Sequence, residues 1–256
     1  MLDKFREAKQ LEIDSLRKDF IDGRIPALYR GERPSFVDAV KAKGPGAVIA
    51  EFKPASPSKG ILRESLNPLD FADMYAANGA AAISVLTEHK YFHGTPDFLF
   101  MMSQPGVPLL RKDFIFDPLQ VAMTASSPAS AVLLIARMCD DATHLQQLIE
   151  ISRMSGLAPV VEIFDQDDLD LARKAGADII QVNNRDLDTL EISLDQGRRF
   201  VKQKQDQELW ICASGVSQRS QVEEMAGLGF DAVLIGTCLM EAEDPGAKLA
   251  ELTGAM

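Results

Sequence analysis

Eight short apolar segments recur along this chain roughly every 25 to 30 residues, and helix-like patterns lie between most of them. The expected strands are residues 47–51, 81–86, 107–112, 131–136, 158–163, 179–183, 209–213 and 232–235, and the expected helices are residues 68–78, 141–155, 167–175, 194–204, 218–228 and 245–252. Strands that alternate with helices favour a parallel sheet joined by crossover helices. Eight such units in about 210 residues predict an α/β fold, a closed (β/α)8 TIM barrel.

An N-terminal helical extension of about 45 residues is predicted to precede the barrel. Residues 1–20 are charged and helix-prone, glycines and prolines then interrupt the pattern, and residues 36–41 predict a further short helix. No linker or low-complexity segment divides the chain. We therefore expect one domain over residues 1–256, with the extension at about 1–45 and the barrel at about 46–256.

The charge of the chain argues against some classes of partner. The sequence has 27 Lys and Arg residues against 38 Asp and Glu, a formal net charge of −11, so we expect no nucleic acid and no membrane as partners. No apolar run approaches the roughly 20 residues of a membrane span. The first nine residues are charged and lack the apolar core of a signal peptide. We expect a cytoplasmic protein. The sequence does not define the oligomeric state, and a monomer is plausible.

The cysteine and histidine positions predict no metal site. Cys139, Cys212 and Cys238 lie far apart and are odd in number, so neither a zinc spacing nor a disulfide framework follows from them. Each follows or lies within an apolar run, which predicts buried thiols. The three histidines, at positions 89, 93 and 144, are also spaced unlike a metal site.

Ionisable and amide residues end several predicted strands. Because side chains alternate faces along a strand, Glu51 and Lys53 point the same way. Lys112, Glu162 and Asn183 end three other strands. In a barrel of this class the active site forms at the carboxyl ends of the strands, so we expect all five side chains at one mouth. Two lysines and two carboxylates there suit acid–base chemistry, although a structural ion pair between Glu51 and Lys53 is the alternative.

Two glycine-containing turns predict a phosphate site. Ser214-Gly215 follows the seventh predicted strand and Gly236-Thr237 follows the eighth. Barrels often bind a phosphate at these two positions, where backbone N–H groups and helix N-termini are available. Residues 56–60, Ser-Pro-Ser-Lys-Gly, form a loop whose hydroxyls, cation and free N–H groups also suit an anionic ligand.

The chain resembles the indole-3-glycerol phosphate synthase family from about residue 34 to the C-terminus, with a similar N-terminal extension. The motifs that carry the resemblance are Glu51-Phe52-Lys53 with the loop that follows, Lys112-Asp113-Phe114, Val161-Glu162, Asn183-Asn184-Arg185-Asp186-Leu187, Ser214-Gly215 and Ile235-Gly236-Thr237. The resemblance implies an enzyme of tryptophan biosynthesis that uses no metal and no organic cofactor. It would convert 1-(2-carboxyphenylamino)-1-deoxyribulose 5-phosphate into indole-3-glycerol phosphate, carbon dioxide and water.

The resemblance also implies roles for individual residues. Lys112 would protonate the substrate carbonyl during ring closure, and Lys53 would lie near the anthranilate carboxylate. In the dehydration, Glu51 would act as base and Lys53 or Glu162 as acid, a division that stays open. Substrate-binding residues would be Ser56, Phe92, Phe114, Asn183 and Arg185, with Leu133 or Leu134 beside the ring, and phosphate-binding residues would be Ser214, Gly215, Gly236 and Thr237. Arg185 alternatively pairs with Asp186 to brace its loop.

Some positions depart from the family pattern. Pro54 stands where a basic residue is usual, Ala213 replaces a usual Glu, and Gln181 replaces a usual Gly. Ala213 removes a carboxylate from the expected site and leaves a second hypothesis open, a catalytically weakened phosphate-binding barrel or partner subunit. A related sugar-phosphate isomerase is a third reading, but such an enzyme uses a Cys/Asp pair and no cysteine ends the first strand here.

Overall fold

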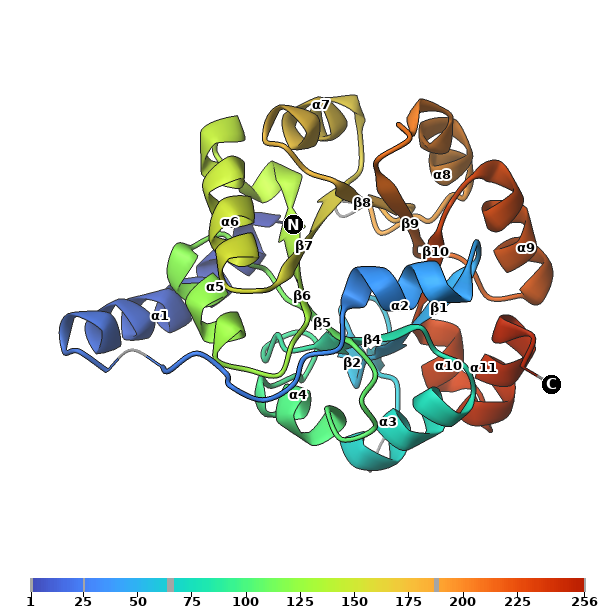
Figure 1. The fold of residues 1–256 in the computed structure, drawn as a ribbon, viewed down its shortest axis with the longest axis horizontal. Helices are drawn as coiled ribbons and strands as arrows, with labels where there is room; N and C mark the ends of the chain where they lie inside the picture. Colours follow the sequence, from blue (N-terminus) through green and yellow to red (C-terminus); the bar gives the residue numbers. More distant parts are fainter. Residues whose placement is uncertain (1, 25, 64–66, 187–188, 256) are drawn as a thin grey trace.

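The computed structural model describes every residue except 1, 25, 64–66, 187–188 and 256. Eight parallel strands close into a barrel in the order β1, β10, β9, β8, β7, β6, β5, β4 (Figure 1). Their bounds are β1 Ala47–Phe52, β4 Ala82–Leu86, β5 Leu109–Lys112, β6 Ala131–Ile135, β7 Ala158–Ile163, β8 Ile179–Asn183, β9 Leu209–Ala213 and β10 Ala232–Ile235. All eight predicted strands are confirmed to within two residues at each end. The predicted (β/α)8 barrel is confirmed as well.

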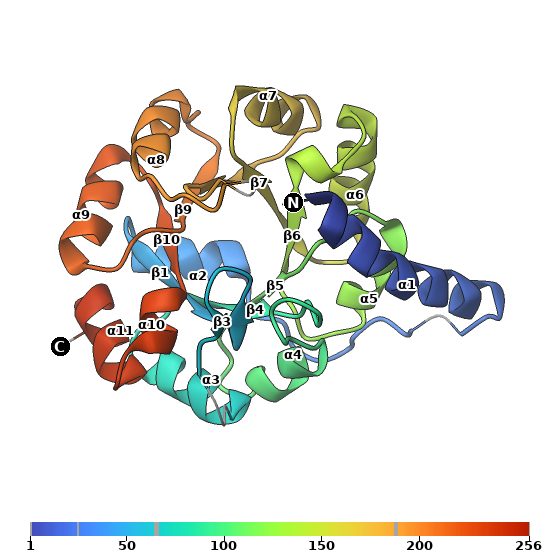
Figure 2. The ribbon, with the colours of Figure 1, turned by 180° about the vertical axis from the view of Figure 1, so that it is seen from behind.

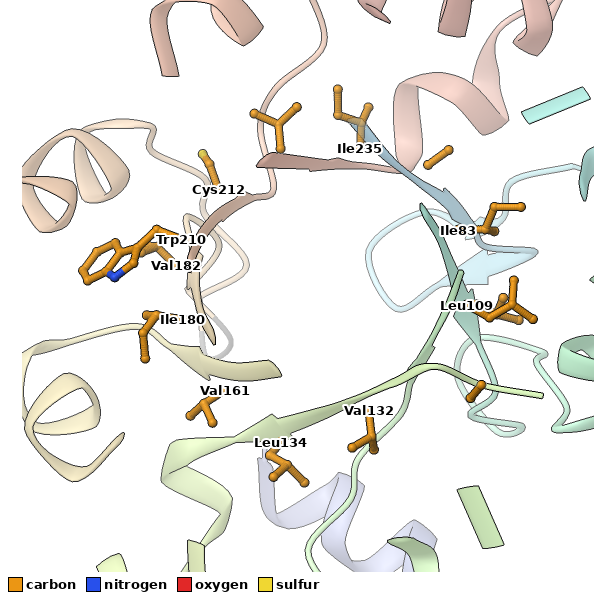
Figure 3. Close-up of a cluster of buried hydrophobic side chains, with 14 of the residues drawn as sticks. Ile83, Leu109, Val132, Leu134, Val161, Ile180, Val182, Trp210, Cys212 and Ile235 are labelled. Atoms are coloured by element: carbon orange, nitrogen blue, oxygen red, sulfur yellow. The ribbon is translucent and has the colours of Figure 1, made fainter. Parts of the chain in front are cut away.

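The alternation of side chains along each strand divides the apolar core into two parts. Outward-pointing residues such as Val132, Leu134 and Trp210 pack between the strands and the surrounding helices (Figure 3). Inward-pointing residues such as Leu110 and Leu133 belong to a separate cluster that fills the barrel. Because both faces of each strand are covered, the strands are buried along nearly their whole length, which explains their continuous apolar runs.

Helices surround the barrel. The six predicted ones are α3 Pro68–Ala77, α6 Ala142–Met154, α7 Gln166–Lys174, α8 Asp195–Phe200 continued by the 3-10 turn η2 Val201–Gln203, α9 Arg219–Leu228 and α11 Pro245–Thr253. Their starts follow local signals: the Asp141 and Asp165 carboxylates accept backbone N–H bonds at the N-termini of α6 and α7. Gly229 ends α9 with a φ of 112°, a left-handed cap that favours glycine.

Several short elements lie outside the sequence-based prediction. They are α4 Asp97–Met102, α5 Pro118–Ala125, α10 Thr237–Glu241, the 3-10 turn η1 Ala136–Met138, and a small hairpin of β2 Ala55–Ser56 with β3 Gly60–Ile61. The hairpin lies in the loop after β1, over the end of the barrel that faces the viewer in Figure 2.

The N-terminal extension forms two helices, as predicted. Helix α2 Phe36–Lys43 lies across the barrel end seen in Figure 1 and buries Phe36 and Val40 against the inner cluster. Helix α1 Leu2–Ile21 packs beside α5 near the opposite end (Figure 2). None of the helices in the described residues has both the length and the apolar character that crossing a bilayer requires.

Candidate active site

A cavity of about 330 Å³ opens at the carboxyl ends of the barrel strands. Thirteen residues proposed from the sequence all line it: Glu51, Lys53, Ser56, Phe92, Lys112, Phe114, Glu162, Asn183, Arg185, Ser214, Gly215, Gly236 and Thr237. They come from seven different strands or the loops that follow them. The structure therefore brings the whole predicted set to one place.

Glu51 and Lys53 form a close ion pair at the end of β1. Lys53 Nζ lies 2.7 Å from Glu51 Oε1, and both side chains are largely buried. Burial alone would raise the pKa of the Glu51 carboxyl, but the positive charges of Lys53 and Lys112 outweigh that effect, and the net pKa lies below its usual range. Glu51 is therefore a carboxylate at neutral pH and is able to accept a proton.

Gly236 leaves the space that the Glu51 carboxylate occupies. A Cβ added at Gly236 would lie 2.3 Å from Glu51 Oε1 and 3.0 Å from Glu51 Cβ. The φ of Gly236 is −129°, so alanine would be excluded by the lack of space and not by backbone strain. Only glycine allows the loop after β10 to approach β1 this closely.

Replacing Gly236 with alanine is expected to push the Glu51 carboxylate away from Lys53. If Glu51 is the base that the family resemblance implies, kcat should fall about 100-fold, since catalytic groups tolerate little displacement. Steady-state kinetics with the carboxyphenylamino-deoxyribulose phosphate that the family resemblance implies measures the effect. Gly227→Ala is the matched control, because an added Cβ there meets nothing within 4 Å. Equal activity in the two variants would contradict the packing argument.

Lys112 faces Glu162 across the cavity. The Lys112 Nζ atom lies 3.9 Å from Glu162 Oε2, at the limit of an ion pair, and Lys112 keeps 21% of its side-chain surface exposed while Glu162 keeps 4%. The lysine is thus the more accessible member of the pair and can reach a molecule in the cavity. The Glu162 carboxylate also accepts hydrogen bonds from two amides of β8, Gln181 Nε2 at 2.6 Å and Asn183 Nδ2 at 3.0 Å.

Asn183 connects Glu162 to the turn after β9. Its Oδ1 atom accepts hydrogen bonds from Ser214 Oγ at 2.9 Å and from the Arg185 backbone N–H at 3.0 Å. The Arg185 guanidinium also donates to the carbonyl of Leu190. Both hydrogen-bonding ends of the Asn183 amide are therefore occupied, and its orientation is fixed.

The turn after β9 has the left-handed backbone expected of a tight ligand-binding loop. Ser214 has a φ of 68° and Gly215 a φ of 93°, and a Cβ at Gly215 would lie 2.7 Å from Ile192 Cγ2. Positive φ at a serine is uncommon and is sustained only by its surroundings, here including the bond to Asn183. Across the cavity, α10 begins at Thr237, and its first N–H groups have no acceptor within the helix.

The loop after β1 reaches across the cavity. Ser56 is 9% exposed, lines the cavity, and its Oγ has no hydrogen-bond partner among the described residues. Lys59, at the tip of the hairpin, pairs with Glu241 at the end of α10. Pro54 lies in the bend before the hairpin, and its carbonyl accepts a bond from the Leu62 N–H at 2.9 Å. The loop thus rests on α10, with Ser56 in the lining of the cavity.

One wall of the cavity is aromatic. Phe114 stacks on Phe5, with ring centroids 3.9 Å apart, and Phe92 lies 6.1 Å from Phe114. Of the two leucines suggested by the resemblance, Leu133 lines the cavity and Leu134 belongs to the outer cluster. Phe5 was missed by sequence reasoning, because it lies in the N-terminal extension, more than 100 residues from its partner.

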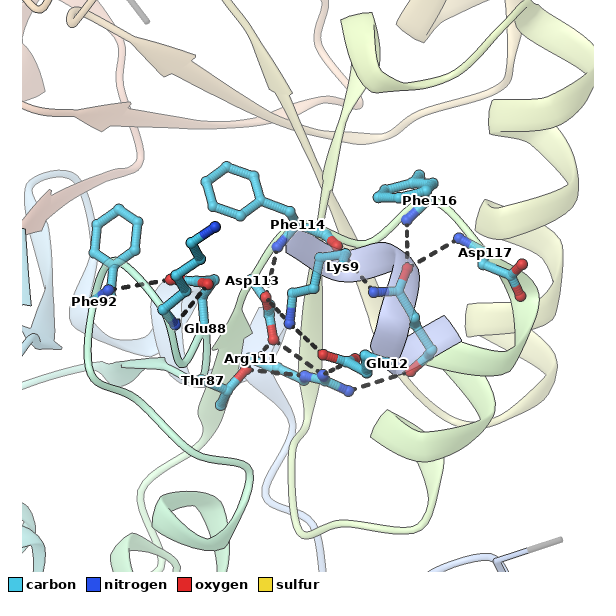
Figure 4. A network of polar contacts seen from close by, with 12 residues as sticks. Lys9, Glu12, Thr87, Glu88, Phe92, Arg111, Asp113, Phe114, Phe116 and Asp117 are labelled. Carbon is cyan, nitrogen blue, oxygen red and sulfur yellow. Dashed lines mark hydrogen bonds and ion pairs between the residues drawn. The ribbon is translucent and has the colours of Figure 1, made fainter. Parts of the chain in front are cut away.

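A buried ionic cluster supports the segment that carries Lys112 (Figure 4). Side chains alternate along β5, so Arg111 points away from the cavity while Lys112 points into it. Asp113, the next residue, lies at the edge of the cavity lining and has a fully buried side chain. The Asp113 carboxylate contacts Arg111 at 3.0 Å and Lys9 at 2.7 Å, and it accepts a hydrogen bond from Thr87 Oγ1 at 2.6 Å. Lys9 comes from α1. The extension therefore contributes directly to the frame behind Lys112.

Glu88 also lines the cavity, yet its carboxylate is occupied by the chain itself. It accepts bonds from the backbone N–H groups of Lys90, Tyr91 and Phe92. These bonds order the loop that presents Phe92 (Figure 4). We assign Glu88 a structural role.

The three cysteines differ in position. Cys139 and Cys212 are buried as expected, and burial raises the pKa of their thiols to about 12 and about 11. Cys238 is only partly buried and lines the cavity, which corrects the prediction for this residue; burial also raises its thiol pKa. Raised pKa values leave all three as neutral thiols. No group of His, Cys, Asp and Glu in the described part of the chain has the arrangement of a metal site.

The fold and cavity define a (β/α)8-barrel protein with an enzyme-type polar site at the carboxyl ends of its strands. Residues 2–252 match the family model described as indole-3-glycerol phosphate synthase. The chain is 40% identical to the indole-3-glycerol phosphate synthase of Albidiferax ferrireducens, covering 98% of this chain and 97% of the relative. It is 39% identical to that of Roseiflexus sp., covering 99% and 98%. The chain belongs to the indole-3-glycerol phosphate synthase family.

Solved structures of other proteins share the fold at much lower identity. The 3-hexulose-6-phosphate synthase of Salmonella typhimurium superposes with a TM-score of 0.65 at 16% identity, covering 81% of this chain and 97% of that chain. A mutant tryptophan synthase alpha-subunit from Pyrococcus furiosus gives 0.61 at 15% identity, covering 82% and 99%. These similarities concern the fold alone.

Proposed function

We propose that this chain catalyses the indole-3-glycerol phosphate synthase reaction of tryptophan biosynthesis, and so acts as a carboxy-lyase. The substrate is 1-(2-carboxyphenylamino)-1-deoxyribulose 5-phosphate. The observation that carries the proposal is the convergence of two lysine–glutamate pairs, Lys53 with Glu51 and Lys112 with Glu162, on one cavity in a member of this family.

The first step forms the carbon–carbon bond of the new ring. The aromatic carbon that bears the carboxylate attacks the ribulose carbonyl carbon, and the carbonyl oxygen takes a proton from Lys112 to become a hydroxyl. The carboxylate then leaves as carbon dioxide, and its bonding electrons restore the aromatic ring. Lys112 suits this role because its ammonium is the more exposed member of its pair. Lys53 is placed to hold the carboxylate until it leaves.

The second step removes water. The new hydroxyl leaves after it is protonated, and a base takes the proton that the ring must lose to become an indole. Glu51 is the proposed base, because it is ionised and lines the cavity. Lys53 or Glu162 supplies the proton to the hydroxyl. Two protons are taken up, one by the carbonyl oxygen and one by the leaving hydroxyl, and one is released to the base, so one proton from solvent replaces the negative charge lost with the carboxylate. The net products are indole-3-glycerol phosphate, carbon dioxide and water.

The remaining cavity residues are proposed to bind the substrate. Ser214, Gly215, Gly236 and Thr237 would hold the phosphate, where the turn after β9 faces the start of α10. Ser56, which lines the cavity from the loop after β1, would also contact the substrate. Phe92, Phe114 and Leu133 would enclose the anthranilate ring, while Asn183 and Arg185 would contact the sugar hydroxyls or a carboxylate.

The proposal is tested by adding the purified protein to the carboxyphenylamino-deoxyribulose phosphate and following indole fluorescence. We expect a steady increase that depends on enzyme concentration. An absence of signal at micromolar protein would refute it. Substrate binding without turnover would instead support the weakened barrel that Ala213 suggests, since this small residue ends β9 where a carboxylate is usual.

A further inference from the structure

Gln181 is a fully buried amide in the interior of the barrel, beneath the cavity. It lies on β8 directly beside Glu162 on β7, and its Nε2 atom donates a hydrogen bond of 2.6 Å to Glu162 Oε2. Gln181 is 0% exposed and does not belong to the cavity lining. It therefore acts on a ligand only through Glu162.

Burying the Gln181 amide costs free energy, and its hydrogen bond to Glu162 satisfies only one end of the amide. Gln181 Oε1 is buried and has no hydrogen-bond partner among the described residues. An unpaired polar atom in an apolar interior lowers stability. Inward-facing neighbours such as Val160 and Ile211 are apolar. An apolar residue at position 181 would suit the core better, so the amide is explained by what it does for Glu162.

The two amides that hold Glu162 differ in their freedom to turn. Asn183 donates to Glu162 Oε1 at 3.0 Å, but its own oxygen already accepts bonds from Ser214 and from the Arg185 backbone. A half-turn of the Asn183 amide would break all three bonds. A half-turn of the Gln181 amide would break only its bond to Glu162, because the opposite end of that amide is unpaired.

We propose that Gln181 is a positioning residue whose amide follows the proton on Glu162. When Glu162 is ionised, Gln181 Nε2 donates to Glu162 Oε2. When Glu162 is protonated at that oxygen, the Gln181 amide turns and Oε1 accepts the bond. Glu162 thus keeps the same position in both protonation states while it exchanges protons in the cavity. The inference rests on the proposed function, and within it on Glu162 rather than Lys53 as the acid that protonates the leaving hydroxyl.

The test is a double-mutant cycle in the indole fluorescence assay. Gln181→Met keeps the volume of the side chain and removes the amide. We expect kcat to fall about 10- to 100-fold, the range seen when a side chain that orients a functional residue by a hydrogen bond is removed. KM should change less than about twofold. In the Glu162→Gln background, the same substitution is expected to change kcat by less than about twofold, because its effect passes through Glu162.

Stability measurements separate positioning from a structural role. We expect Gln181→Met to melt at or above the temperature of the unaltered protein, since it removes an unpaired buried oxygen. Gln181→Leu serves as a second apolar variant if the methionine variant does not fold. Ser130→Ala is the matched control: the Ser130 hydroxyl is also buried and unpaired among the described residues, but it precedes β6 at the other end of the barrel. The kcat of the Ser130→Ala variant should equal that of the unaltered protein.

The outcomes distinguish the inference from the proposed function. An unchanged kcat in Gln181→Met, or an equal fall of kcat with and without the Glu162 carboxylate, overturns the inference and leaves the proposed function intact. An unaltered protein that shows no turnover overturns both.

Discussion

Replacing Lys112 with methionine is expected to lower kcat by about 10²- to 10⁴-fold, the usual cost of losing a general acid. Methionine keeps much of the volume of lysine but carries no proton to donate. The proposed phosphate contacts come from other loops, so inhibition by inorganic phosphate should persist at a similar concentration. Indole fluorescence measures the first effect and competitive inhibition measures the second.

Lys90→Met is the matched control for this prediction. Lys90 is an exposed lysine in the loop after β4 and does not line the cavity, so its replacement should leave kcat unchanged. If Lys112→Met weakens phosphate binding as much as it slows turnover, Lys112 is a structural residue and its assignment as the acid is wrong.

Replacing Asp113 with asparagine is expected to destabilise the fold by about 3 kcal/mol, because it removes the fully buried counter-charge of two buried cations. Among the described residues, Lys9 and Arg111 then keep only the partly exposed Glu12 carboxylate, at 2.6 Å and 3.7 Å. Lys9 and Arg111 are 3% and 2% exposed and both contact this carboxylate. Thermal unfolding followed by circular dichroism should show a clearly lower melting temperature. The variant Glu223→Gln is the control, since Glu223 forms an exposed pair with Arg219 and exposed pairs contribute little. Equal losses in the two variants would contradict the argument.

The stability difference between the unaltered protein and Asp113→Asn should depend on pH. Burial by itself would raise the pKa of the Asp113 carboxyl, but Arg111 and Lys9 outweigh it and hold the pKa below its usual range. A carboxyl whose pKa is lower in the folded state adds stability above its unfolded pKa and loses it as the pH falls towards the folded value. Since an unfolded aspartate titrates near pH 3.9, we expect the difference to be full at about pH 6 and to shrink below about pH 4.

The strands and the mouth of the barrel were predictable from the sequence because the signals are local. A parallel strand buried on both faces is a continuous apolar run, and the residue that ends such a run is at the carboxyl end by definition. Glu51, Lys112 and Glu162 were therefore placed from their neighbours in sequence alone. Their convergence followed from the count of strands, without any knowledge of contacts.

Elements that depend on distant contacts were not predictable in this way. Helices α4 and α10 have six and five residues, too short for an amphipathic period to appear. Phe5 and Lys9 gave no signal, because a helix with charged and apolar residues does not reveal which strand it will meet. Gln181 was noticed only as a departure from a family pattern. Its bond to Glu162 depends on the register between β7 and β8, which the sequence alone does not give.

The pairing of β1 with β10 has a consequence for how the protein is made. Ala47 lies opposite Ala232 and Ala50 opposite Ile235. The barrel therefore closes only when β10, its last strand, has been synthesised and pairs with β1. During synthesis from the N-terminus, the free edge of β1 stays exposed until nearly the whole chain has left the ribosome, and such edges invite association with other chains. Glu51 meets Gly236 only at that closure. A chain released before β10 is made would therefore carry all four proposed catalytic residues yet have no completed site.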